Sequence, residues 1–137
     1  MRLLTIPKIP DVRGNISFLQ YPDQIPFEIR KVYWINDIPS GADRDGQANK
    51  HSRELIIALS GSFEVIAGDG FQETRYSLNR PDMCLYIPKM IWRQLVNFST
   101  NSVALIITDE DAGNADNFID FSTFQLAVKD VSKVQGI

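Results

Sequence analysis

The sequence is poor in the side chains that carry most metal and redox chemistry, with one cysteine and one histidine among 137 residues. A single cysteine excludes an internal disulfide, and the position of Cys84 inside the apolar run MCLYI indicates a small buried side chain. His51 alone cannot supply the several imidazoles of a histidine-rich metal site. The net charge is −3 and no cluster of Lys or Arg stands out, which argues against a nucleic-acid-binding surface.

No hydrophobic run is long enough for a membrane span. The N-terminal MRLL begins like a signal peptide, but Pro7, Lys8 and Pro10 interrupt the apolar run too early. We therefore expect no membrane partner and a cytoplasmic location. The chain is 44% hydrophobic and 23% charged, as is ordinary for a globular protein, and its length predicts a single domain over residues 1–137.

Short apolar segments bounded by Gly and Pro fill most of the chain, a pattern typical of a β-sandwich or barrel. Gly61 predicts a tight hairpin between strands at 54–60 and 63–67. A short helix is expected within residues 116–128, followed by a peripheral tail at 129–137. The remaining strands are expected at residues 2–6, 16–20, 27–36, 73–79, 83–88, 91–98 and 103–109.

The stretch from Gly41 to Gly61 has the spacing of a metal-binding β-hairpin without the ligands. Five residues separate Gly41 from the run Gln47-Ala48-Asn49, and Glu54 follows after four more. This spacing is similar to the first motif of the cupin barrels, which place two histidines and a glutamate at these positions. A second cupin frame, Asp82 to Asn97, carries Arg93 where its histidine ligand stands. We predict an all-β, single-domain cupin (an RmlC-like jelly-roll barrel) with a short C-terminal helical tail.

These replacements argue against a metal ion and against any other cofactor. Alternate residues of a strand share a face, so Gln47, Asn49 and His51 are expected to face the barrel interior. Neutral amides are poor ligands for a transition metal, and the permanent charge of Arg93 would repel a divalent ion. An ion pair between Glu54 and Arg93 is predicted to fill the space instead.

From about residue 5 to residue 124 the chain resembles the sugar-nucleotide 3,4-ketoisomerases, the WxcM-like cupins. The segments that carry the resemblance are DVRG at 11–14, IPFEIRKVYWI at 25–35, Arg44, Ala48, Lys50, LSGS at 59–62, LYIPKMIW at 85–92 and the stretch from Asn117 to Phe124. The resemblance implies a homodimer with a metal-free pocket that isomerises dTDP-4-keto-6-deoxyglucose to the 3-keto sugar. The N-terminal strand is a candidate to join the partner's sheet.

The departures fall in the site itself. The resemblance implies catalytic histidines at positions 47, 49 and 93, where this chain has two amides and a guanidinium. Gln47 and Asn49 cannot abstract protons, although they can bind sugar hydroxyls. Two other residues are candidates for catalysis. His51 lies about 7 Å beyond Asn49 on the strand, or else at an exposed strand end, and Tyr33 can donate a hydrogen bond.

Further residues are candidates for contacts with a dTDP-sugar. Phosphate recognition favours guanidinium and ammonium groups, although each of these groups is equally explained as a solvated charge. Tyr86 is a candidate pocket residue, with core packing as the competing explanation. The predicted substrate-binding set is Arg13, Arg44, Gln47, Asn49, Lys50, Glu54, Tyr86 and Arg93.

Three functions remain open from the sequence. We favour a sugar-nucleotide-binding cupin of cell-surface polysaccharide biosynthesis that is catalytically silent. The alternative is an active ketoisomerase or epimerase on a nucleotide-linked 4-keto sugar, using His51 or Tyr33. A further alternative is a non-enzymatic small-molecule sensor or dimeric scaffold.

Overall fold

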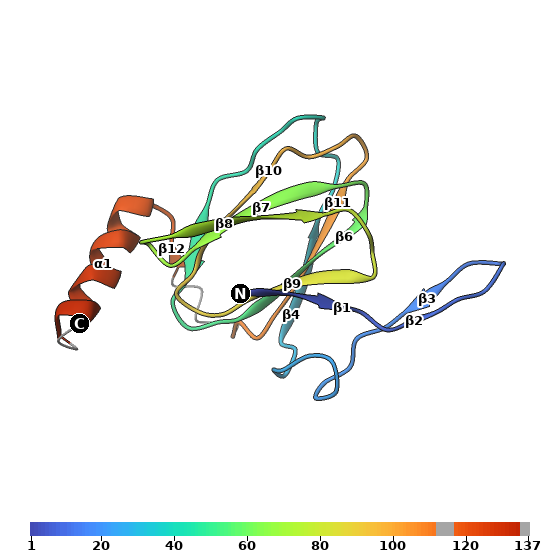
Figure 1. Cartoon of the computed structure of the whole chain (residues 1–137), viewed down its shortest axis with the longest axis horizontal. Coiled ribbons are helices and arrows are strands. Elements are labelled where there is room, and N and C mark those ends of the chain that lie inside the picture. The colour runs from blue at the N-terminus through green and yellow to red at the C-terminus, as the bar shows by residue number, and fades with distance from the viewer. Residues whose placement is uncertain (112–116, 135–137) are drawn as a thin grey trace.

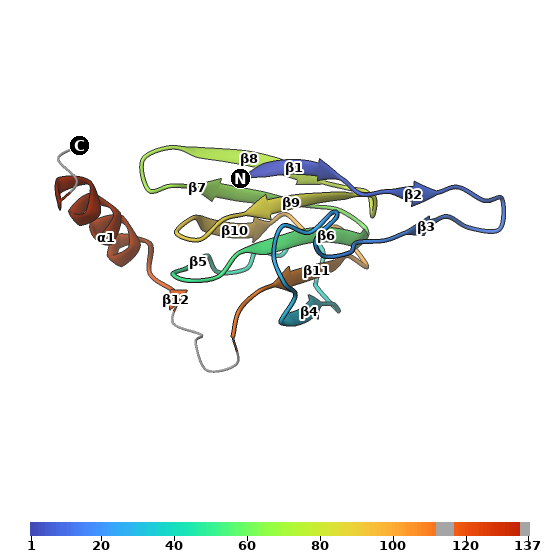
Figure 2. The same ribbon diagram turned by 90° about the horizontal axis from the view of Figure 1, so that it is seen from below.

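The computed structural model describes residues 1–111 and 117–134 as two five-stranded antiparallel sheets that face each other (Figures 1 and 2), with a hairpin and a helix attached. One sheet has the order β1-β9-β6-β11-β4 and the other β12-β5-β10-β7-β8. The strands are β1 (Arg2–Thr5), β2 (Lys8–Ile9), β3 (Ile16–Ser17), β4 (Lys31–Ile35), β5 (Gln47–Asn49), β6 (Glu54–Ser60), β7 (Phe63–Gly68), β8 (Glu73–Leu78), β9 (Met83–Ile87), β10 (Trp92–Val96), β11 (Val103–Thr108) and β12 (Asn117–Phe118), and the helix is α1 (Phe121–Val134).

The core lies between the two sheets and is filled by alternate residues of the strands. Val65, Leu85, Leu95 and Ile106 are fully buried there. Since successive side chains of a strand point to opposite faces, the neighbours of these residues face outward. This arrangement confirms the predicted all-β jelly-roll barrel with a helical C-terminal segment.

A second apolar cluster covers the outer face of the first sheet, where Ile25 and Phe27 pack against Leu55, Ile57 and Cys84. The sequence predicts burial of Cys84, and the structure confirms it. Burial raises the pKa of the Cys84 thiol to about 11, so the thiol stays protonated and unreactive at neutral pH.

The predicted hairpin at Gly61 is wrong, because β6 and β7 belong to different sheets. Gly61 has a φ of 67° and makes the sharp turn, but the chain crosses there from one sheet to the other. A Cβ at this position would lie 2.6 Å from Ser99 Oγ and 2.7 Å from Ser102 Oγ, so the crossing is packed too closely for a side chain. A glycine turn between two strands therefore does not by itself predict that the strands pair.

Other expected boundaries also change. Only Ile16 and Ser17 of the expected strand at 16–20 are extended, and they pair with Lys8 and Ile9. The strand expected at 27–36 begins at Lys31, because the residues before it pack under the sheet as a loop. The helix begins at Phe121 and continues past 128 to Val134, so part of the expected tail is helical. Asp116 and residues 135–137 of these two predictions lie outside the described residues.

The N-terminal strand β1 is an edge strand and pairs on one side with β9 of its own chain. β1 runs antiparallel to β9, with Leu3 opposite Leu85 and Leu4 opposite Cys84. The β2–β3 hairpin instead projects away from the barrel, on the side opposite α1 (Figures 1 and 2). Within the described part of the chain no helix is both long and apolar enough to span a membrane.

Candidate functional site

A polar cavity of about 420 Å³ opens where the edge strand β4 of one sheet faces β5 and β10 of the other. We call it the barrel-mouth cavity. Its lining residues are Tyr33, Trp34, Ile35, Asn36, Arg44, Asp45, Gln47 and Arg93.

The inner wall of the cavity is a buried ion pair. Arg93 donates from Nε to Glu54 Oε1 at 2.6 Å and from Nη2 to Glu54 Oε2 at 3.3 Å. This confirms the ion pair that the sequence predicts. Burial by itself would lower the pKa of Arg93, but the charge and hydrogen bonds of Glu54 outweigh it and hold the pKa above its ordinary value. Arg93 is therefore a fixed cation at every pH at which the protein is folded.

Tyr33 completes this group from β4. Arg93 Nη2 also donates to Tyr33 Oη at 3.2 Å, which leaves the hydroxyl proton of Tyr33 free to donate to a ligand in the cavity. Burial raises the pKa of Tyr33 above its ordinary value, and the charge of Glu54 adds to the shift. At neutral pH the tyrosine is therefore a hydrogen-bond donor and not a base.

The two amides that replace the expected histidines form a stack along β5. Gln47 Nε2 donates to Asn49 Oδ1 at 3.3 Å, and Gln47 lines the cavity while Asn49 is buried beyond it. Among the four positions that bind metal in cupins, only Glu54 has an anionic side chain. Both oxygens of its carboxylate already accept hydrogen bonds from Arg93. These residues do not fit a metal ion, and no three His, Cys, Asp or Glu side chains come together within the described ranges.

Six of the predicted site residues do not line the barrel-mouth cavity: Asn49 and Glu54 are buried behind its wall, and four others lie elsewhere. His51 is exposed and follows the end of β5, so the strand alternation that was expected to point it inward stops before it. Lys50 Nζ lies 4.6 Å from the centre of the Phe118 ring. Tyr86 packs against the second apolar cluster, on the outer face of the sheet. Arg13 is at the tip of the β2–β3 hairpin, paired with Asp11 at 2.9 Å and highly exposed.

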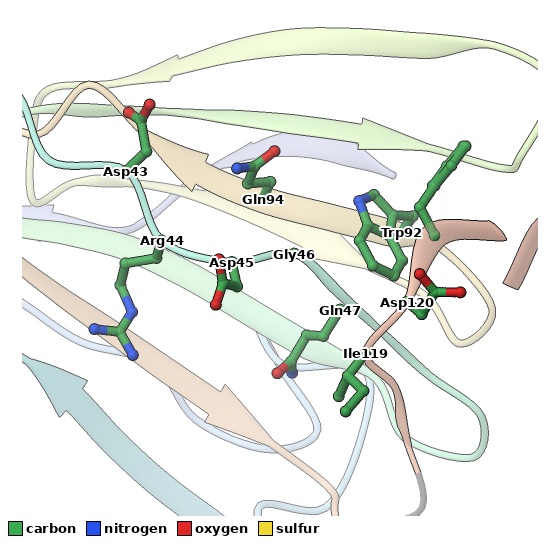
Figure 3. Close-up of a pocket in the computed structure, with 10 residues that line it drawn as sticks. Asp43, Arg44, Asp45, Gly46, Gln47, Trp92, Gln94, Ile119 and Asp120 are labelled. Atoms are coloured by element: carbon green, nitrogen blue, oxygen red, sulfur yellow. The ribbon is translucent and has the colours of Figure 1, made fainter. Parts of the chain in front are cut away.

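Four lining residues were not in the predicted set, namely Trp34, Ile35, Asn36 and Asp45, and of these only Asp45 carries a charge. It lies in the irregular segment before β5, whose backbone is fixed by the bond from Arg44 N to Leu95 O at 2.9 Å. The side chains of Arg44, Asp45 and Gln47 extend to the same side of this segment, away from Gln94 (Figure 3). The two-position spacing of Asp45 and Gln47 is the signal in the sequence that could have found Asp45, although Arg44, on the same side, does not follow the alternation of a strand.

An outer groove of about 770 Å³ continues from the cavity, sharing Arg44, Asp45 and Gln47 with it (Figure 3). Its floor is Trp92, which packs edge-on against Phe121 at 5.4 Å between ring centres. A Cβ on Gly46 would lie 2.5 Å from the Trp92 ring, so this glycine is what lets the indole lie flat against the strand. Helix α1 thus covers the back of the strand that carries Arg93.

Comparison with known proteins identifies the family of this barrel. The sequence model of the WxcM-like, C-terminal family matches residues 1–129. The chain belongs to this family. It is 27% identical, over 90% of its own length and 89% of the relative's, to the TDP-4-oxo-6-deoxy-α-D-glucose-3,4-oxoisomerase of Aneurinibacillus thermoaerophilus.

Solved structures of family members superpose closely on this chain. The 3,4-ketoisomerase of Helicobacter canadensis is 30% identical with a TM-score of 0.89, covering 93% of this chain and 96% of the other. The enzyme of Thermoanaerobacterium thermosaccharolyticum, solved with TDP, is 25% identical with a TM-score of 0.89 over 95% of each chain. A mutant of that enzyme, with one histidine replaced by asparagine, is solved with TDP-4-keto-6-deoxyglucose at 25% identity, a TM-score of 0.88 and 94% coverage of each.

Proposed function

We propose that this protein binds a TDP-linked 4-keto-6-deoxyhexose, with the keto sugar in the barrel-mouth cavity and the diphosphate beside Arg44. The observation that carries the proposal is the cavity itself, a polar space at the open edge of a barrel that belongs to the WxcM-like family. We also propose, from the sequence, a cytoplasmic location and a role in cell-surface polysaccharide biosynthesis.

The chemistry of the lining suits a keto sugar. Tyr33 has a hydroxyl proton to donate to the sugar carbonyl, and the Gln47 amide can pair with sugar hydroxyls as donor and acceptor. Arg44 sits where the cavity opens into the outer groove, and guanidinium groups bind diphosphate oxygens in pairs. The buried cation of Arg93 completes a wall that is complementary to partial negative charge.

Loss of the expected histidines does not exclude substrate binding. The mutant of the Thermoanaerobacterium enzyme holds TDP-4-keto-6-deoxyglucose with a histidine changed to asparagine. An amide and an imidazole are both planar and both offer hydrogen bonds, so an amide can preserve contacts to hydroxyl groups while removing the proton-transfer group. Gln47 and Asn49 are substitutions of this kind.

Neither catalytic candidate from the sequence is placed as a base. His51 is exposed outside the cavity, and Tyr33 stays protonated at neutral pH because its pKa is raised. Their positions therefore argue against the alternative of an active ketoisomerase that uses His51 or Tyr33 as its base. A sensor or scaffold function has no feature of the cavity in its favour, because the lining is polar and charged in the way that a sugar nucleotide requires.

We further propose that the protein is a homodimer, joined through the β2–β3 hairpin. This hairpin projects from the barrel and exposes Ile9, Val12 and Ile16, with Val12 fully exposed. An apolar hairpin of this kind is poorly stable alone and is suited to packing against a second copy. Arg13 at its tip contacts a sugar nucleotide only if the hairpin of one protomer reaches the cavity of the other.

The oligomeric state tests this part of the proposal. Sedimentation velocity should give a dimer, and the pair Val12→Asp and Ile16→Asp should convert it to a monomer because two carboxylates would be buried in the interface. Leu126→Asp, on the exposed side of α1, is the matched control and should leave the dimer intact. A monomeric wild-type protein at micromolar concentration would rule the dimer out.

Thermal stabilisation by nucleotides tests the binding proposal. A ligand at one hundred times its Kd adds about 2.7 kcal/mol to the free energy of unfolding, which corresponds to a rise in Tm of roughly 5–15 °C for a chain of this size. We expect this rise with TDP and not with UDP or with free sugars. Arg44→Ala should remove most of it, and Arg75→Ala, on β8 and outside the cavity, should not. Absence of a shift with TDP would contradict the proposal.

A further inference from the structure

We propose that Asp45 is the general base of a 3,4-ketoisomerisation in this protein, in place of the histidines that the site lacks. This inference rests on the proposed binding of a TDP-linked 4-keto sugar and goes further, because it makes the site active. Asp45 is the one carboxylate that lines the barrel-mouth cavity in the described part of the chain, since Glu54 lies behind Arg93.

The position of Asp45 meets the first requirement of a base, which is access to the substrate. No hydrogen bond or ion pair to another described residue occupies its carboxylate, whereas Arg93 ties up Glu54 in the same wall. It stands next to Gln47, with both side chains on the same side of the segment (Figure 3). A sugar held by Gln47 therefore lies within reach of Asp45.

Tyr33 and Arg93 supply the second requirement, which is stabilisation of the charge that develops on the carbonyl oxygen. Arg93 fixes the Tyr33 hydroxyl by donating to its oxygen, so its proton is directed to a ligand. Ketosteroid isomerase uses the same chemistry: an aspartate base enolises the substrate next to a ketone, while a tyrosine and a protonated aspartic acid donate to the oxyanion. Here the guanidinium of Arg93, hydrogen-bonded to the tyrosine, lies on the same wall of the cavity.

The reaction balances with these groups alone. The carboxylate of Asp45 takes the proton from C3, the C–H electron pair forms the C3=C4 bond, and the carbonyl pair moves to O4, where Tyr33 and Arg93 stabilise it. The proton of the O3 hydroxyl passes to O4. The pair on O3 then forms the new carbonyl at C3, and C4 takes the proton back from Asp45. The product is the 3-keto sugar, and no oxidant or reductant is consumed.

Isotope exchange tests this assignment. The whole chain, in the oligomeric state that it has in solution, is incubated with TDP-4-keto-6-deoxyglucose in deuterated water. NMR then follows the incorporation of deuterium at C3 and C4 of the sugar. Asp45→Asn should lower the rate of incorporation about 10²–10⁴-fold, the usual contribution of a general base, while the thermal shift with TDP stays. Asp45→Glu, which keeps the carboxylate but displaces it, should recover part of the rate.

Asp43→Asn is the matched control, because Asp43 is a carboxylate of the same segment that accepts from the Asn97 backbone N–H and does not line the barrel-mouth cavity. It should keep the rate within about twofold. The inference is overturned if Asp45→Asn keeps the wild-type rate, if His51→Ala abolishes incorporation, or if the wild-type protein binds TDP without any exchange. Binding of TDP without exchange would leave a catalytically silent binding protein. Failure to bind TDP would instead refute the proposed function.

Discussion

Replacing Arg93 with methionine should lower the free energy of unfolding by about 3–5 kcal/mol, one of the two largest effects that we expect from the structure. The change leaves the Glu54 carboxylate buried, with only 1% of its surface exposed, and removes both of its hydrogen bonds from the guanidinium. An unpaired buried charge is far costlier than a lost surface contact. Urea denaturation followed by circular dichroism measures the difference.

A surface ion pair provides the control. Arg75 and Glu64 approach to 3.4 Å, but their side chains are 55% and 25% exposed. Arg75→Met should therefore cost less than about 1 kcal/mol. Changing both members of the buried pair, Glu54→Leu with Arg93→Met, should recover most of the stability, because two apolar side chains leave no buried charge. A double variant as unstable as Arg93→Met would show that the pair is not the source of the loss.

Restoring histidines with Gln47→His and Asn49→His should raise the rate of 3,4-isomerisation about 10²–10⁴-fold over that of the unmodified chain. Position 47 lines the cavity and contacts position 49, so an imidazole at 47 faces the substrate with a second imidazole behind it. Conversion of TDP-4-keto-6-deoxyglucose, followed by NMR, measures the gain. Because imidazole acts as a base only when neutral, the added activity should increase as the pH rises through about 6.5.

Gln94→His is the matched control for this gain. Gln94 is also a glutamine on the second sheet, but it lines the outer groove and not the barrel-mouth cavity. A histidine there should leave the rate unchanged. An increase with Gln94→His equal to that of the double variant would mean that the added imidazoles act from solution and not within the cavity.

The barrel was predictable because its signals are local and repeated. Alternating apolar residues define the strands, and the spacing from Gly41 to Glu54 defines the β5–β6 region, so the elements around the cavity lie where the sequence places them. Which strands pair with each other was harder to predict from the sequence. Gly61 looks like a hairpin turn, and the fact that β6 and β7 enter different sheets depends on β9, β10 and β11, which come later in the chain.

The site was predictable where it depends on strand alternation and less so where it depends on loops. The Glu54–Arg93 pair follows from two inward-facing strand positions, one in each sheet, and it is present. His51 was expected to share a face with Asn49, but β5 ends at Asn49 and the alternation ends with it. Asp45 was overlooked because it precedes the strand, although one residue separates it from Gln47 just as one separates Gln47 from Asn49.

The packing of α1 on Trp92 has a practical consequence for work on this protein. Trp92 and Arg93 are consecutive residues of β10, so their side chains point to opposite faces of the strand. Trp92 contacts the aromatic rings of the helix, and Arg93 forms the ion pair inside the barrel. Truncating the chain before Phe121 would remove the aromatic rings that pack against Trp92. We expect β10, which positions Arg93, to be less rigid as a result. Affinity tags and fusion partners are therefore better attached where they leave Phe121 and Phe124, at the start of this helix, packed against Trp92.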